Sequence, residues 1–247
     1  MTTKTYVWRD RLIKGCIIVG LAMPVTAVST QVAPVGPAMA TGCTVPLNGS
    51  WVGSWTIGSG ATGNFITKLK YTSTTAGNYK VTGTAKIFGS TITNGGRITG
   101  TVVCGQLTFG VVSGTYPITF TGSFTSATAV GPGTFTSNVP GGSGEWSGFR
   151  AAPAIVLTTT SGVPGTTTTV NGTSFMPYEQ VVVTYKTRLP APNGVATLCS
   201  GQAASDGSFS CTGTIPAGTA AGPLGVHKVL AAGSVSRLKG TSAFTLT

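Results

Sequence analysis

Short runs of apolar and β-branched residues follow one another along most of the chain after residue 43. Runs such as Tyr79–Phe88 and Glu179–Thr187 are rich in Val, Ile, Thr, Tyr and Phe, and turns rich in Gly, Pro, Asn and Ser separate them. β-branched and aromatic residues fit a pleated, half-buried strand better than a helix. Side chains two or four residues apart in a strand share one face, so we expect Trp51 and Trp55 to point inward together. The pattern predicts an all-β protein.

The first segment, residues 43–150, is expected to form a meander of eight short strands. Turn signals recur roughly every 8–12 residues, a spacing typical of sandwiches and barrels. Eight sequential strands close most simply as an up-and-down barrel, which removes both exposed sheet edges, and a sandwich is the alternative. The predicted strands are Trp51–Ile57, Asn64–Tyr71, Tyr79–Phe88, Arg97–Val103, Gln106–Val112, Tyr116–Phe124, Ala129–Thr136 and Glu145–Arg150.

A second segment, residues 154–247, is expected to form a seven-stranded β-sandwich of immunoglobulin-like type. Residues 149–153 (Phe-Arg-Ala-Ala-Pro) form the predicted linker, because the residue before a proline prefers extended geometry. The predicted strands are Ala154–Thr158, Thr166–Asn171, Glu179–Thr187, Ala196–Ala203, Ser208–Thr214, Gly225–Ala231 and Ala243–Thr247.

The first 40 residues have the composition of a secretory signal peptide. Four basic residues precede the apolar run Cys16–Val28, and a small-residue segment ends in Ala38-Met39-Ala40. A positive flank, a short apolar core and an A-x-A site mark such a peptide. The run is shorter than the roughly 20 residues of a spanning helix, with an uncleaved signal anchor as the alternative. We expect a mature chain from about Thr41, secreted or held at the cell surface.

Four of the five cysteines follow this leader, so two disulfides are expected in an exported chain. Cys199 and Cys211 flank a short predicted turn, which would set them directly opposite one another in an antiparallel hairpin and within bonding range; two free thiols are the alternative. Cys43 and Cys104 would then pair within the first segment. The competing interpretation makes Cys43 a lipid acceptor after Ala40-Thr41-Gly42, so that a membrane is contacted only through an uncleaved or lipidated N-terminus.

The stretch Gly162–Tyr185 carries a family resemblance. A Pro-Gly turn leads into the threonine-rich run Thr166–Val170, Asn171-Gly172 is expected to end that run in a turn, and a Phe-Met-Pro corner precedes the strand Val181–Tyr185. This order resembles the opening of the bacterial immunoglobulin-like (IPT/TIG-like) extracellular repeat. Later segments extend the resemblance over about residues 154–247: Ser205–Ser210, Ile215–Gly218, Gly225–Val229 and Phe244–Thr247. It implies a non-catalytic extracellular module.

The segment 43–150 has a resemblance of its own. It opens with Gly49-Ser50-Trp51-x-Gly53-x-Trp55, repeats T-G-[ST] steps at residues 82–84, 99–101 and 121–123, and closes with Gly144–Gly148. These motifs resemble a small glycine-rich β module of exported bacterial proteins. That resemblance implies no established activity.

Catalytic groups are scarce in the predicted mature chain. Its acids are Glu145, Glu179 and Asp206, and its one histidine is His227. Asp206 belongs to an Asp-Gly turn, and His227 is expected to be a half-exposed strand residue without a second metal ligand at the right spacing. Sugar hydrolysis would need two carboxylates about 5–10 Å apart. We therefore expect no enzyme, no catalytic residue and no metal.

A phosphate-loop pattern also occurs, at Gly58–Gly63 (GSGATG). Dinucleotide binding through G-x-G-x-x-G requires a helix to begin directly afterwards, and a strand is predicted there instead. The pattern is therefore interpreted as a hairpin loop, and no cofactor is expected.

The charge is strongly basic. The formal net charge is +11, and removal of the leader, which holds four bases and Asp10, lowers it to +8. The bases are scattered over separate predicted strands and do not cluster in the sequence. Lys68 and Lys70 share one face of their strand, and Lys80 and Lys86 share one face of theirs. Because nucleic-acid sites need clustered bases, specific nucleic-acid binding is not expected. The expected role is a non-catalytic structural or binding module, with anionic envelope polymers or glycans as partners through long-range attraction. A small-ligand carrier inside the first barrel and an adhesin for anionic glycans are the alternatives.

Overall fold

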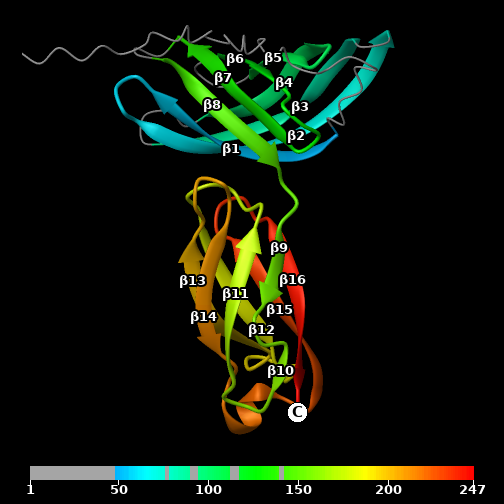
Figure 1. Ribbon diagram of the computed structural model, residues 1–247, viewed down its shortest axis with the longest axis vertical. Coiled ribbons are helices and arrows are strands. Elements are labelled where there is room, and N and C mark those ends of the chain that lie inside the picture. The colour runs from blue at the N-terminus through cyan, green and yellow to red at the C-terminus, as the bar shows by residue number, and fades with distance from the viewer. Residues whose placement is uncertain (1–47, 76–77, 90–93, 112–116, 139–141) are drawn as a thin grey trace, which may run out of the picture. The chain divides into compact units, whose positions relative to one another are not determined.

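The computed structural model describes residues 48–75, 78–89, 94–111, 117–138 and 142–247 (Figure 1). Strands dominate these ranges, and the helical content within them is the short 3₁₀ helix η1 (Gly218–Ala221). The all-β prediction is confirmed. The predicted signal peptide (residues 1–40) and Cys43 lie outside the described residues.

Eight antiparallel strands, each paired with the next and β8 paired with β1, form a closed barrel (Figure 1). The up-and-down barrel prediction is confirmed, because every connection joins neighbours in the sequence. The strands are β1 (Gly49–Ile57), β2 (Thr62–Thr75), β3 (Asn78–Gly89), β4 (Asn94–Val103), β5 (Gln106–Val111), β6 (Ile118–Ser123), β7 (Ala129–Ser137) and β8 (Ser143–Arg150).

The barrel interior is filled by alternate side chains of its strands. Trp51 and Trp55 are both 2% exposed, as their spacing predicted, and Trp55 lies opposite Trp146 of β8. The Trp55 indole lies against the backbone of Gly63 and Gly89, where any Cβ would collide with the ring. Large rings therefore fit a narrow barrel because glycines in neighbouring strands leave room for them.

Tight turns join the barrel strands. The β4–β5 connection consists of Cys104 and Gly105, which have φ values of 44° and 84°. Positive φ at both central residues is the requirement of a type I′ hairpin turn, whose twist matches that of the flanking strands. Residues 58–61 of the phosphate-loop pattern form the β1–β2 turn, and Thr62 and Gly63 already belong to β2, so the hairpin interpretation of Gly58–Gly63 is confirmed.

The remaining strands form two sheets, as the sandwich prediction required. One sheet has the order β10-β16-β15-β12-β13 and the other has the order β14-β11-β9. Strand β10 pairs in parallel with β16, while β9, just before it in the chain, pairs with β11. The strands are β9 (Ala154–Leu157), β10 (Ser161–Gly162), β11 (Thr167–Thr173), β12 (Gln180–Lys186), β13 (Val195–Gln202), β14 (Phe209–Thr214), β15 (Gly225–Gly233) and β16 (Lys239–Leu246).

Inward side chains from both sheets share one apolar core. Phe175, Tyr185 and Phe244 are fully buried in it, and Phe175 meets Phe209 edge to face with ring centroids 5.2 Å apart. The predicted turn at Asn171-Gly172 is wrong: both residues lie within β11, opposite Ser210 and Phe209. Gly172 is accommodated there because the Phe209 ring occupies the space of its missing side chain.

Candidate functional site

Five basic side chains gather on the outer surface of three adjacent barrel strands. Lys68 and Lys70 lie on β2, Lys80 and Lys86 on β3, and Arg97 on β4, and all five are exposed. We call this surface the basic face. The sequence suggested isolated bases on separate strands, but β2, β3 and β4 are direct neighbours in the barrel. The bases therefore form a single patch.

Strand register decides how the basic face is arranged. Lys68 of β2 lies opposite Thr84 of β3, which in turn lies opposite Arg97 of β4. One step along the strands, Lys70 lies opposite Thr82. Cross-strand neighbours on one face are close enough to contact a single ligand.

The cross-strand rows at the two ends of the basic face each contain one base, and that base lies on β3, the middle strand. Lys80 lies between Thr72 and Thr101, and Lys86 lies between Ile66 and Gly95. No two bases of the basic face lie directly opposite one another, and Thr84 separates Lys68 from Arg97, which limits repulsion across the strands.

No acidic residue occurs between Thr62 and Val103 to neutralise the basic face. The barrel acid Glu145 lies on β8, four strands from β4 in a ring of eight. Exposed like charges without a counter-charge nearby create a positive potential that attracts anions. The barrel surface is therefore electrically polarised around its circumference.

Arg150, the remaining base of the described barrel, is used structurally. Its guanidinium carbon lies 4.9 Å from the centre of the Trp51 ring, a cation–π geometry. Its Nη1 donates to the carbonyl oxygen of Asn48 at 2.6 Å, and its Nε donates to that of Ala127 at 3.4 Å. These contacts hold Arg150 against the barrel wall rather than in the basic face.

The three acids of the predicted mature chain, Glu145, Glu179 and Asp206, lie on different elements, and each has its own set of contacts. Glu145 is exposed between Thr56 and Thr134 in cross-strand register. Asp206 belongs to the β13–β14 turn, where its Oδ1 accepts hydrogen bonds from the Oγ of Ser208 at 2.6 Å and its N–H at 2.9 Å. These bonds hold the pKa of Asp206 below its ordinary value, so its structural role as a turn residue is confirmed.

Glu179 is buried, 2% exposed, and its carboxylate is saturated by donors from two loops. Its Oε1 accepts from the Met176 N–H at 3.0 Å and the Ser236 hydroxyl at 2.7 Å, and its Oε2 accepts from the Ser236 N–H at 3.0 Å and the Val235 N–H at 3.3 Å. Sequence reasoning missed this site. The carboxylate joins the β11–β12 corner to the β15–β16 loop.

His227 differs from its prediction: it is 1% exposed rather than half-exposed. Its Nδ1 lies 2.8 Å from the carbonyl oxygen of Lys186, and its Nε2 lies 2.7 Å from that of Pro223. The ring stacks on Tyr185 at 4.8 Å, and the Tyr185 hydroxyl donates to the carbonyl oxygen of Ala221 at 3.1 Å. Together the two rings tie the η1 segment to β12 and β15.

One cavity among the described residues lies between the inward aromatic rings of the barrel. It has a volume of about 10 Å³ and is lined by side chains such as Trp51, Phe65, Phe109 and Trp146. Ligand pockets usually measure roughly 300–1,000 Å³. Aromatic side chains occupy the space that a carried ligand would need.

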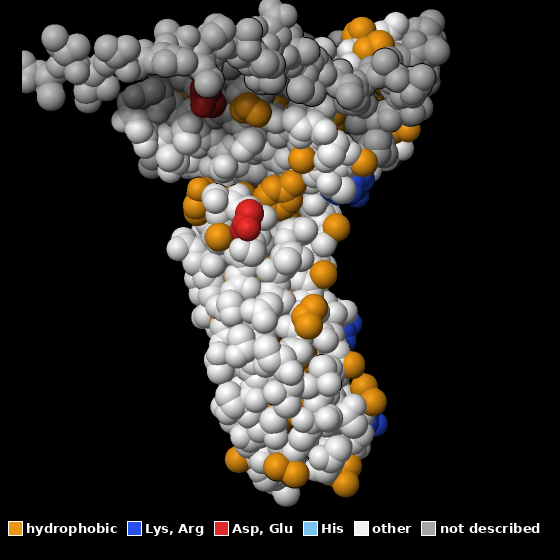
Figure 2. Space-filling model, in the orientation of Figure 1, with side chains coloured by type: hydrophobic (Ala, Val, Ile, Leu, Met, Phe, Trp, Pro, Cys, Tyr) orange, Lys and Arg blue, Asp and Glu red, His pale blue; other side chains and the backbone are white. Residues whose placement is uncertain are grey.

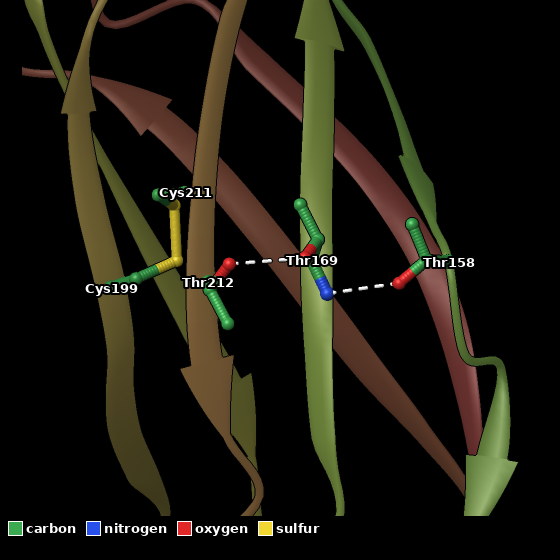
Figure 3. The surroundings of a disulfide bond; sticks show 5 residues. All are labelled: Thr158, Thr169, Cys199, Cys211 and Thr212. Carbon is green, nitrogen blue, oxygen red and sulfur yellow. Dashed lines mark hydrogen bonds between the residues drawn. A yellow bond between two sulfur atoms is a disulfide. The ribbon is translucent and has the colours of Figure 1, made fainter.

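The Cys199–Cys211 disulfide is present, with Cα atoms 5.9 Å apart (Figure 3). The expected arrangement within one hairpin ladder is wrong, because β13 and β14 belong to different sheets. The bond instead connects the edge strands of the two sheets. The Cys43–Cys104 bond stays a prediction, since Cys43 lies outside the described residues; Cys104 lies at the exposed β4–β5 turn.

Beside this disulfide, the outer surface of β14-β11-β9 is uncharged. Thr169 shares a hydrogen bond with Thr212, Oγ1 to Oγ1, at 3.0 Å, and its N–H donates to the Thr158 hydroxyl at 3.0 Å (Figure 3). Figure 2 shows the sandwich surface turned toward the viewer as mostly white, with scattered orange patches, one red patch near its upper end, and Lys and Arg at its right edge. The sandwich bases lie instead on the other sheet and its loops: Lys186, Arg188, Lys228, Arg237 and Lys239.

Comparisons with known proteins leave the chain without an assigned family. No family model matches it, and no curated protein matches it. A solved structure of a polysaccharide lyase aligns with 75% of this chain and 34% of its own, at 9% identity and a TM-score of 0.27. The chain thus spans about a third of that protein's length, and a likeness this weak carries no argument.

Over the part of the chain that the structure describes, no helix is both long and apolar enough to cross a membrane. Over the same residues, no group of three or more His, Cys, Asp or Glu side chains is placed to hold a metal ion.

Proposed function

We propose that this protein is a non-catalytic binding module of the bacterial cell surface or secretome, and that the basic face of its barrel holds anionic polymers or glycans. The observation that carries the proposal is the gathering of five exposed bases on β2, β3 and β4, on a stretch without acids. Such a surface concentrates polyanions by long-range attraction. The interaction weakens as salt screens it.

Export and family membership are parts of the same proposal. A disulfide that links two sheets persists in an oxidising compartment, which supports a location outside the cytoplasm. The sandwich topology and the motifs between residues 154 and 247 support an immunoglobulin-like repeat of IPT/TIG type. Such folds present rigid surfaces, and their function depends on the site they display.

Small-ligand carriage in the barrel receives less support. A cavity of about 10 Å³ holds about one water molecule rather than a ligand. A carrier would need several of the inward rings to move aside together.

Elution from an anionic-polymer resin in rising salt tests the proposal. Replacement of Lys68, Lys70 and Lys80 by Gln should shift elution to clearly lower salt. The matched control replaces Lys186, Lys228 and Lys239 of the sandwich by Gln, which removes the same charge elsewhere. An equal shift in both triple variants would show that net charge alone causes retention, and would contradict a binding face on the barrel.

A further inference from the structure

The arrangement of side chains on the basic face indicates a particular class of anionic ligand. Resting on the proposed function, we propose that its ligand is a linear polyol-phosphate polymer, in which phosphodiester groups alternate with hydroxylated units. Three features of the face carry this inference: the spacing of the charges, the kind of base, and the hydroxyls between the bases.

The charges follow one another along the strands as a track. The rows of Lys86, Lys68 with Arg97, Lys70 and Lys80 are successive outward positions, two residues apart. Two residues of strand span about 7 Å, and neighbouring strands lie about 5 Å apart, so the track is long and narrow. A phosphodiester polymer carries its charge within its backbone, so it can lie along such a track with successive phosphates near successive bases.

The kind of base is compatible with a tetrahedral anion. Four of the five bases are lysines, and Arg97 is the one guanidinium among them. The arginine fork suits carboxylate and phosphate alike, whereas lysine acts as a point charge that can approach phosphate oxygens from any direction. Isolated lysines therefore fit the phosphates of a flexible chain, and the titration below compares them with the carboxylates of an acidic polysaccharide.

The threonines between the bases provide partners for a hydroxylated unit. Thr82 of β3 lies opposite Thr99 of β4, and both are exposed next to the row of Lys68 and Arg97. Each hydroxyl can donate one hydrogen bond and accept others, as a polyol hydroxyl can. A chain of phosphates and polyols can thus be contacted along its whole length.

Single-stranded nucleic acid shares the phosphodiester backbone, but its recognition also requires aromatic rings on which the bases stack. Its binding sites stack successive bases on several aromatic rings. On this face Phe88, at the end of β3, is half-buried, while Phe65 and Tyr79 point into the barrel core. Over the described residues of β2, β3 and β4, the face thus provides charge and hydroxyls without a stacking platform, which favours the polyol phosphate.

The experiment compares three probes with equal numbers of charges by calorimetric titration of the whole protein: poly(glycerol phosphate), oligogalacturonate and oligothymidylate. We expect poly(glycerol phosphate) to bind tightest. Lys70→Gln with Lys80→Gln should reduce the slope of log affinity against log salt by roughly 0.7 for each lysine that contacts a phosphate. The charge-matched control, Lys228→Gln with Lys239→Gln, should leave that slope unchanged.

A hydroxyl variant tests the polyol contacts separately. Thr82→Val with Thr99→Val should weaken poly(glycerol phosphate) binding several-fold and leave its salt slope unchanged. The matched control is Thr119→Val with Thr136→Val, an opposed exposed pair on β6 and β7, which should bind like the parent protein.

The outcomes separate the inference from the proposed function. Equal binding of oligogalacturonate, or tighter binding of oligothymidylate, with the same lysine dependence overturns the polyol-phosphate assignment and leaves the basic face as a site for anions. If replacement of the barrel lysines leaves the binding of all three probes unchanged, both the polyol-phosphate assignment and the proposed function are overturned.

Discussion

Glu179 is a buried carboxylate whose hydrogen-bond partners come from backbone N–H groups and one hydroxyl. Four donors from residues 176, 235 and 236 converge on its two oxygens. Hydrogen bonds to a charged group contribute more than those between neutral groups. A single side chain thus fixes two loops of the sandwich, although the sequence presents it only as one of few acids.

The first prediction concerns this carboxylate. Glu179→Gln replaces one acceptor oxygen by an NH₂ group that must face N–H donors, so the free energy of unfolding should fall by about 2–3 kcal/mol. Chemical denaturation followed by circular dichroism measures the change. Glu145→Gln, the same replacement at an exposed position, should change the free energy by less than about 0.5 kcal/mol. A neutral Glu179→Gln would show that the four bonds do not stabilise the fold.

Tyr185 provides a prediction about pH. Burial raises the pKa of its hydroxyl from 10.0 to about 12. Below pH 10 the hydroxyl is protonated in both folded and unfolded chains, so its contribution to stability does not vary. Between pH 10 and 12 the unfolded chain loses the proton first, and stability falls as pH rises.

Comparison with Tyr185→Phe isolates this contribution. The variant loses the hydrogen bond to Ala221 and should be less stable at neutral pH, but its free energy of unfolding should fall less steeply between pH 10 and 12. Denaturation across that range measures both slopes. Identical slopes would mean that Tyr185 titrates in the folded protein as it does in the unfolded chain.

At the scale of elements, a cluster of aromatic rings from several strands packs inside the barrel. Phe120 of β6 stacks on Phe109 at 4.9 Å between centroids and meets Trp146 at 5.7 Å and an interplanar angle of 89°. Offset stacking and edge-to-face contacts add to the free energy of burial itself. Rings from several strands thus join non-neighbouring parts of the barrel wall.

The third prediction removes one of these rings. Phe120→Ala should lower the free energy of unfolding by about 3–5 kcal/mol, because it leaves a cavity among rigid neighbours. Tryptophan fluorescence during denaturation reports the change, since Trp146 contacts the ring directly. The control is Thr119→Ala, the exposed neighbour on the same strand, which should be nearly neutral. A small effect of Phe120→Ala would indicate a loosely packed interior.

Most strands were predictable because each has a buried face and ends at a turn residue. The exceptions have physical reasons. Strand β10 has two residues and pairs in parallel with β16, so no alternation can indicate it. Strand β16 begins at Lys239, four residues before its predicted start, because Lys239-Gly240-Thr241-Ser242 is polar and its pairing with β15 alone makes it a strand.

At the scale of the whole molecule, two separate cores contain most of the buried apolar residues that the structure describes. One consists of barrel residues and the other of residues from Ile155 to Leu246, and they have no member in common. From Thr41 onward every tryptophan lies in the barrel, at positions 51, 55 and 146. Tryptophan fluorescence therefore reports on the barrel, whereas circular dichroism reports on both sets of strands.

The fourth prediction uses this difference. Cys199→Ser with Cys211→Ser should lower the free energy of unfolding of the sandwich by about 2–3 kcal/mol, because the bond closes a short loop in the unfolded chain. The circular-dichroism transition should shift while the tryptophan-fluorescence transition stays in place. A shift of both transitions together would show that barrel and sandwich unfold as one unit.

Local composition by itself determined the class of structure, the meander order of the barrel strands and the partners in the Cys199–Cys211 bond, because β-branched runs, turn residues and short loops act between near neighbours in the chain. Closure of the barrel was left to the pairing of β1 with β8, which lie far apart in the sequence. Only the tertiary structure decided which side chains share a surface or a core. Register between strands brings Lys68, Lys70, Lys80, Lys86 and Arg97 into one face, and the division into two sheets makes the disulfide a link between them. Glu179 and His227 are buried by loops that meet from distant parts of the sequence. Such contacts depend on pairing over long separations, which no local pattern of residues specifies.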